Sequence, residues 1–199
     1  MGKEFATIKV PSREFWDSKK ECFYTIKGQE LILKHSLLSL SKWEAKWHIP
    51  FLVDEKRNPK YKKTHEMMVD YIRCMTVNNV EDERVYYILS QENMEEINKY
   101  ITDPMTATTF SDHSDDKGGK PNTSGSFLTA EVIYYQMFEL NIPLELQKWH
   151  LNRLLTLIRV MAEKKEQANN PKKMSHADLA KQNRALHAAR RKPHHTPRR

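Results

Sequence analysis

Glycine is scarce in this chain, with 5 among 199 residues. Backbone conformations with positive φ, which tight turns, bulges and phosphate-cradling loops need, are adopted most readily by glycine. The scarcity argues against an all-β fold with many tight turns and against a nucleotide-binding loop. We therefore predict a mainly α fold.

The chain contains enough apolar residues for one domain. Hydrophobic residues make up 39% of it and charged residues 30%, against about 45–50% and about 25% in an average globular domain. The 7 Phe, 4 Trp and 8 Tyr residues compensate, because each aromatic side chain buries a large area. We predict a folded, mainly helical domain over residues 1–165 and an extension over residues 166–199.

Positive charge is concentrated in the extension. Between positions 164 and 199, eleven Lys and Arg residues face two acidic residues, which gives this stretch a net charge of +9 and leaves −2 for the rest of the chain. The segment 175–192 has only a thin apolar face. We predict a basic tail that is helical or disordered until it contacts a partner.

Cysteine usage and hydropathy point to a reduced protein without a membrane segment. Cys22 and Cys74 lie far apart and form no CxxC motif, so no disulfide framework or zinc site is indicated. No stretch approaches the about 18–20 uninterrupted apolar residues that a membrane helix needs. We expect a cytosolic protein with no membrane partner.

Short extended segments are predicted near the N-terminus. Residues 5–10 and 22–27 are rich in β-branched and aromatic side chains, and a turn at Gly28-Gln29 leads into residues 30–34. These segments predict a small β-hairpin or β-meander. Because so few strands are not stable alone, they are expected to pack on helices.

Helical periodicity dominates from residue 41 onward. Ser41 and Glu44 have the spacing of a capping box that opens a helix ending before Pro50. Apolar spacing and capping residues predict further helices over 64–76, 83–89, 90–103, 129–140 and 143–165. The helix over 129–140 is apolar nearly all round, so we expect it to be buried.

A polar segment over about 106–126 is predicted to be a flexible loop. It contains Asp112, His113, Asp115 and Asp116, whose carboxylates and imidazole suit a hard metal ion. However, their spacing lacks the twelve-residue calcium-loop pattern. A solvated acidic loop is the favoured interpretation, and no metal site is predicted.

No catalytic constellation is visible. The histidines form no HExxH motif, and no GxSxG, Walker-type or GxGxxG pattern occurs. Cys74, next to Arg73, is a candidate nucleophile, but a cysteine on a methionine-rich helical face is more typical of a core. We predict a binding protein that is not an enzyme and needs no cofactor.

Aromatic and basic residues are the candidates for partner binding. Trp43 and Trp47 lie four residues apart on one helical face, which suits either a core or a partner contact. The nine methionines suit irregular packing or an adaptable apolar groove. The predicted partner-binding residues are Trp43, Trp47, Tyr134, Tyr135, Phe138, Trp149, Arg153, Arg190 and Arg191.

Several segments together resemble proteins encoded by long-tailed bacteriophages. The resemblance covers about residues 35 to 192, and as a set it is similar to tail assembly chaperones. The segments that carry it are Ser41-Lys-Trp-Glu-Ala-Lys-Trp-His-Ile-Pro-Phe51, Asp70-Tyr-Ile-Arg-Cys-Met75, Pro104-Met-Thr-Ala-Thr-Thr-Phe110, Ile142-Pro-Leu-Glu-Leu-Gln-Lys-Trp-His-Leu-Asn-Arg-Leu-Leu-Thr-Leu-Ile-Arg159, Lys172-Lys-Met-Ser175 and Asn183-Arg-Ala-Leu-His-Ala-Ala-Arg-Arg191.

The resemblance implies a protein that acts during tail assembly. Such chaperones coat the long apolar tape measure protein before the tail tube polymerises around it, and they leave as tube subunits arrive. This implies that residues 1–165 bind a client, that the chain is a homo-oligomer, and that the tape measure and tail tube proteins are its partners. It also implies a place in the host cell cytoplasm and absence from the mature virion.

Two other functions stay open. One is a structural protein of the virion, in the head–tail joint or the tail. The other is a basic nucleic-acid-binding protein that uses the tail to contact phosphates. Against the second, the tail has no aromatic residues interleaved for base stacking, so a protein-binding arm is favoured.

Overall fold

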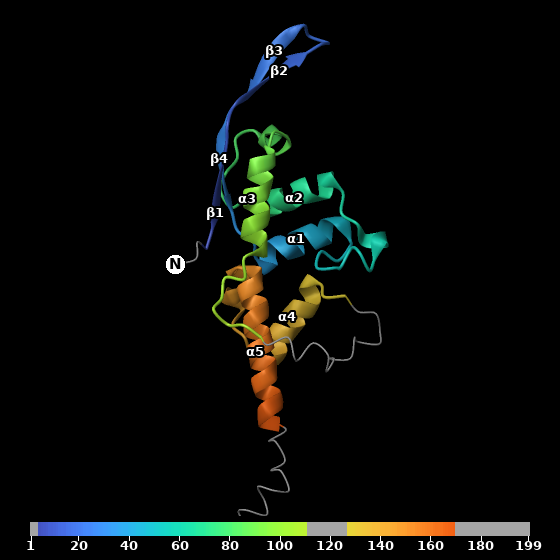
Figure 1. The fold of residues 1–199 in the computed structure, drawn as a ribbon, viewed down its shortest axis with the longest axis vertical. Helices are drawn as coiled ribbons and strands as arrows, with labels where there is room; N and C mark the ends of the chain where they lie inside the picture. Colours follow the sequence, from blue (N-terminus) through green and yellow to red (C-terminus); the bar gives the residue numbers. More distant parts are fainter. Residues whose placement is uncertain (1–3, 111–126, 170–199) are drawn as a thin grey trace, which may run out of the picture. The chain divides into compact units, whose positions relative to one another are not determined.

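A computed structural model of the chain describes residues 4–110 and 127–169 (Figure 1). The chain divides into unit 1, residues 1–159, and unit 2, residues 160–199. The predicted boundary between residues 165 and 166 stays a prediction. The loop prediction for residues 111–126 and the tail prediction for residues 170–199 lie outside the described residues.

The prediction of a mainly α fold is wrong. In the described part of the chain, five α-helices accompany four β-strands in two small antiparallel sheets, with about 50% helix and 16% strand. The fold is therefore an α+β mixture. The low glycine content suggested few strands, because an all-β fold needs many tight turns. Here all four strands belong to one long ribbon, which needs few such turns.

The ribbon has two halves. In the inner half, β1 (Ala6–Val10) pairs antiparallel with β4 (Gln29–Leu33), and Ile8 lies opposite Leu31. In the outer half, β2 (Arg13–Asp17) pairs antiparallel with β3 (Cys22–Ile26). The outer half extends beyond the helices of unit 1 (Figure 1). Segment 13–17 was not predicted as a strand.

The hairpin turn lies between β2 and β3 and contains no glycine. Glu21 takes the left-handed conformation there, with φ of 50°, and Asp17 Oδ1 accepts the Lys19 N–H at 2.9 Å. The turn predicted at Gly28-Gln29 is wrong, because the chain runs there from β3 into β4. A Cβ on Gly28 would lie 2.7 Å from the backbone nitrogen of Ser12, so glycine permits a close approach of the two chains.

Three helices follow the ribbon. They are α1 (Leu37–Trp47), α2 (His65–Met75) and α3 (Gln91–Thr102). The capping residues Thr64 and Ser90 begin α2 and α3 as predicted. The predicted start at Ser41 is wrong: Ser36 caps α1, and Ser36 and Ser39 exchange hydrogen bonds between side chain and backbone.

The last helices are separated by a short 3₁₀ segment. The helix α4 spans Ala130–Glu139, the 3₁₀ helix η4 spans Leu144–Lys148, and α5 spans Leu151–Asn169. The continuous helix predicted over 143–165 is therefore wrong in its first turns. Two more 3₁₀ helices, η1 (Pro59–Tyr61) and η2 (Glu83–Tyr87), lie in the connections before α2 and α3.

The core of unit 1 lies between the inner half of the ribbon and the helices. Fully buried side chains come from every layer. The prediction that the strands pack on helices is confirmed for β1, which contacts α3, whereas β3 belongs to the outer half, which extends beyond the helices. The largest of the fully buried side chains are those of Trp43, Tyr71, Ile8, Leu31, Leu33, Leu37, Leu40, Ile72, Met75, Ile97, Ile133 and Met137. In unit 2, the described residues 160–169 belong to α5, and residues 162–166 are exposed.

The side chain of Glu44 on α1 binds the backbone of two other segments, at Phe51 and at Ala130. Its Oε1 accepts the Phe51 N–H at 2.8 Å, and its Oε2 accepts the Ala130 N–H at 2.7 Å. Thr129, at the N-cap of α4, makes no capping hydrogen bond with its own side chain. Glu44 therefore caps α4 from another helix. Burial raises the pKa of its carboxyl, and the two N–H donors oppose that shift.

Replacing Glu44 by alanine is expected to destabilise unit 1. The change leaves the buried N–H groups of Phe51 and Ala130 without an acceptor, which costs about 2–3 kcal/mol. Urea unfolding followed by circular dichroism measures this loss. Glu131→Ala, which removes an exposed carboxylate on α4, is the matched control, and an equal loss in both variants would contradict the capping role of Glu44.

Candidate functional site

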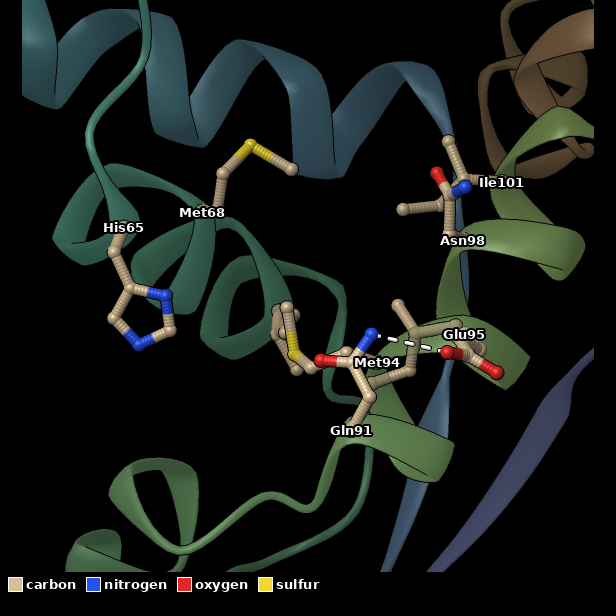
Figure 2. Close-up of a pocket in the computed structure, with 9 residues that line it drawn as sticks. His65, Met68, Gln91, Met94, Glu95, Asn98 and Ile101 are labelled. Carbon is tan, nitrogen blue, oxygen red and sulfur yellow. Dashed lines mark hydrogen bonds between the residues drawn. The ribbon is translucent and has the colours of Figure 1, made fainter.

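An apolar groove lies between α2 and α3 and encloses about 380 Å³. His65 and Met68 line it from α2, and Met94, Asn98 and Ile101 line it from α3 (Figure 2). The floor is made by buried and half-buried aliphatic and thioether side chains: Met68, Ile72, Met94, Ile97 and Ile101.

Polar side chains form only the rim of the groove. The exposed residues His65, Gln91, Glu95 and Asn98 surround the apolar floor. Gln91 Nε2 donates to Glu95 Oε1 at 3.0 Å, a contact drawn as a dashed line in Figure 2. The floor offers no charged or strongly hydrogen-bonding group to orient a polar ligand. An apolar segment with polar flanks fits this chemistry best.

An ionic cluster holds α2, the first wall of the groove, against α1. Asp70 is buried and accepts Lys46 Nζ at 2.5 Å, Trp47 Nε1 at 2.9 Å and an Arg73 guanidinium nitrogen at 3.1 Å. Burial opposes ionisation, but these donors outweigh it and hold the pKa of Asp70 below its ordinary value. The carboxylate is therefore charged and fully engaged with its neighbours.

The second wall, α3, is held by its contacts with the ribbon. Asn93 is buried and its Nδ2 donates to the Lys9 carbonyl of β1 at 3.2 Å. Tyr100 donates from its hydroxyl to the Glu4 carbonyl at 3.0 Å. Each helix is thus held on the side that faces away from the groove. The side chains that α2 and α3 turn toward each other remain uncovered.

A second apolar surface lies on α4. Tyr135 and Phe138 are each 65% exposed, and their spacing of three residues puts them on one face of the helix. The prediction that this helix is buried is therefore wrong for this face. Tyr134 instead turns its hydroxyl to Gln147 Oε1 at 2.9 Å.

The other predicted partner-binding residues fall into different environments. Trp43 is fully buried and donates from Nε1 to the Met67 carbonyl at 2.8 Å, so it belongs to the core. Trp47 is half-buried in the cluster around Asp70. The Arg153 guanidinium lies 4.1 Å from the centre of the Trp149 ring. Arg190 and Arg191 lie outside the described residues.

The groove residues were missed as a site although their sequence pattern was visible. Met94, Ile97 and Ile101 form the apolar stripe of α3, and Met68 belongs to that of α2. A stripe of this kind predicts a core face. The feature of the sequence that could have indicated the groove is the methionine content of these two stripes. A flexible thioether suits an adaptable surface that the core covers only partly.

A buried histidine pair lies apart from the groove. The rings of His35 and His150 are 5.0 Å apart, and the Tyr71 hydroxyl lies 2.6 Å from His35 Nδ1. Burial, and next the charge of His150, lower the pKa of His35 to about 3. Burial also lowers the pKa of His150. Both rings are therefore neutral at physiological pH.

The part of the chain that the structure describes contains neither a metal-ligand cluster nor a membrane-spanning helix. Within residues 4–110 and 127–169, no group of three or more His, Cys, Asp or Glu side chains is placed to hold a metal ion. The acidic cluster at 112–116 lies outside those ranges. In the same part of the chain, no helix has the length and apolar character needed to span a membrane.

Comparison with known proteins adds no family assignment. No protein-family profile, curated protein or solved structure matches the chain.

Proposed function

We propose that this protein is a tail assembly chaperone of a long-tailed bacteriophage and that its α2–α3 groove holds apolar side chains of the tape measure protein. The observation that carries the proposal is the groove, with its apolar floor and polar rim. An amphipathic helix buries its apolar face in such a groove and leaves its polar flanks at the rim. The chaperone class itself comes from the resemblance of residues 35 to 192.

The composition of the floor suits a client with many different helical segments. Met68 and Met94 are half-buried on opposite walls, and methionine adapts its shape to different apolar partners. Tyr135 and Phe138 on α4 supply a separate exposed surface for a second contact, with the client or with a tube subunit. The proposal thus assigns client capture to the groove and a further partner contact to α4.

Placing a carboxylate in the groove is expected to abolish client capture. Met94→Glu and Met68→Glu bury a charge against an apolar client side chain, which costs several kcal/mol unless the charge is paired. Co-expression with the tape measure protein and affinity purification measure the effect. The wild-type chain should keep the client soluble and co-purify with it. The amount of client that co-purifies with each variant should be at least about tenfold lower.

The control is Val77→Glu, which introduces the same carboxylate at a valine that is 55% exposed and away from the groove. It should capture the client as well as the wild type does. Equal capture by the groove variants would contradict the proposed site. Failure of the wild-type chain to capture the client would contradict the function, and a fixed copy number in purified virions would favour the structural alternative.

A further inference from the structure

The β-ribbon has covered edges only along its inner half. On the β4 side, Val77 N–H donates to the Ile32 carbonyl at 2.9 Å, and Asn78 Nδ2 donates to the Glu30 carbonyl at 2.8 Å. On the β1 side, Asn93 covers the Lys9 carbonyl. These contacts satisfy backbone groups that an edge strand would otherwise present to a new strand.

The outer half differs at both edges. Among the described residues, β2 and β3 form no backbone hydrogen bond with any other element. One side chain of the neighbouring segment reaches this half, because the Arg84 guanidinium lies 5.6 Å from the Tyr24 ring. The backbone at the outer edges of β2 and β3 is thus available to another strand.

Aromatic side chains occupy both faces of the outer half. Phe15 stacks on Tyr24 across the strands with ring centres 5.6 Å apart, and Trp16 meets Phe23 on the opposite face at 4.9 Å. Trp16 is 54% exposed and Phe23 is 70% exposed. A two-stranded hairpin that is apolar on both faces is marginal in water, and a concentrated apolar patch marks an interaction surface.

The two outer edges are not equivalent. The strand β2 carries Arg13, Glu14 and Asp17, and charges of this kind protect an edge against pairing. The strand β3 has the sequence Cys-Phe-Tyr-Thr-Ile and carries no charge. Glu21 precedes it and Lys27 follows it. Apart from Arg84, which lies beside the Tyr24 ring, the β3 edge carries no protecting charge between Glu21 and Lys27. The opposite charges of these two residues lie at its two ends.

We propose that β3 pairs antiparallel with β3 of a second copy of this chain, with Tyr24 opposite Tyr24 of that copy. In this register Glu21 of each copy lies opposite Lys27 of the other, so two-fold symmetry forms the ion pair twice. Centring the pair on Phe23 would instead put Lys19 opposite Lys27. The charge pattern thus selects one register for a four-stranded sheet, and this contact does not depend on client binding.

Reversing the charges at the two ends of β3 tests the pairing. Glu21→Lys and Lys27→Glu each turn two attractive pairs into two repulsive ones, so each should raise the dimer Kd about tenfold at low salt. The double variant Glu21→Lys/Lys27→Glu should return the Kd to within about twofold of the wild type. Sedimentation equilibrium of the full chain measures all four proteins.

Cysteine scanning reads the register independently. In a Cys22→Ser background, Tyr24→Cys should form an intermolecular disulfide on mild oxidation, because directly opposed Cα atoms lie within disulfide range. Phe23→Cys and Thr25→Cys, which face other residue types in this register, should cross-link far less. A chain that stays monomeric up to its solubility limit, a double variant as weak as the single ones, or equal cross-linking at all three positions would overturn the proposal.

Discussion

Replacing Trp43 by alanine is expected to lower the free energy of unfolding by about 3–5 kcal/mol. The indole is fully buried, and its ring meets Phe51 edge-on with centres 5.0 Å apart. Truncation leaves a cavity beside Phe51 and Tyr71 and removes the N–H that the Met67 carbonyl accepts. Urea unfolding followed by circular dichroism measures the loss.

The exposed aromatic residues of α4 supply the control for Trp43. Phe138→Ala removes a side chain that is 65% exposed, so it should change stability by less than about 0.5 kcal/mol. The pair of variants separates a core role from a binding role. If Trp43→Ala kept wild-type stability but lost its client, Trp43 would be a binding residue after all.

Acid is expected to destabilise unit 1 between about pH 6.5 and pH 5, before most carboxylates titrate. The pKa of His35 is lowered from 6.5 to about 3 in the folded state. Over that interval the unfolded chain binds a proton that the folded chain excludes. The contribution of His35 therefore leaves the free energy of unfolding at its full value above pH 6.5. As the pH falls, the free energy of unfolding decreases, and the loss reaches about 2 kcal/mol at pH 5.

Neighbouring groups refine this expectation. The pKa of His150 is also lowered, so its titration adds to the loss. The raised pKa of Glu44 works in the opposite direction, because the folded state then binds the proton more readily. His35→Asn should therefore flatten the dependence of the urea midpoint on pH, whereas His65→Asn, at an exposed position, should leave it unchanged. An equally steep dependence in both variants would count against His35.

Helix positions were predicted best where a capping residue stands directly before an apolar stripe. Thr64 and Ser90 satisfy that condition and begin α2 and α3. The start of α1 was misplaced because its reciprocal cap uses Ser39 in the position where Glu or Gln is usual. Glu44, which suggested a cap at Ser41, instead faces inward to the backbone of Phe51 and Ala130.

The strands were harder to predict because pairing partners determine them. Residues 13–17 include three charged side chains and no β-branched one, so only Phe15 and Trp16 favour a strand locally. Their conformation follows from pairing with Cys22–Ile26. A turn was predicted at Gly28 because glycine is common in turns. In the structure, Gly28 instead allows a close approach of two backbone segments inside the ribbon.

The candidate site was the part least accessible to sequence reasoning. Periodicity identified Met94, Ile97 and Ile101 as one stripe, but periodicity does not say whether a neighbouring helix covers that stripe. For the same reason the helix over 129–140 was expected to be buried although Tyr135 and Phe138 are exposed, and Trp43, a predicted partner-binding residue, is in the core. Which faces stay open depends on the directions of α2, α3 and α4, and these depend on long-range contacts such as those of Asp70, Asn93 and Glu44.

The cap that Glu44 provides attaches α4 to α1 through residues that are far apart in the sequence. The carboxylate of α1 holds the first N–H of α4 across 86 positions of sequence. This contact positions the aromatic surface of Tyr135 and Phe138 on the helices of unit 1. If this attachment is strong enough, co-expressed fragments 1–117 and 118–199 are expected to reassemble.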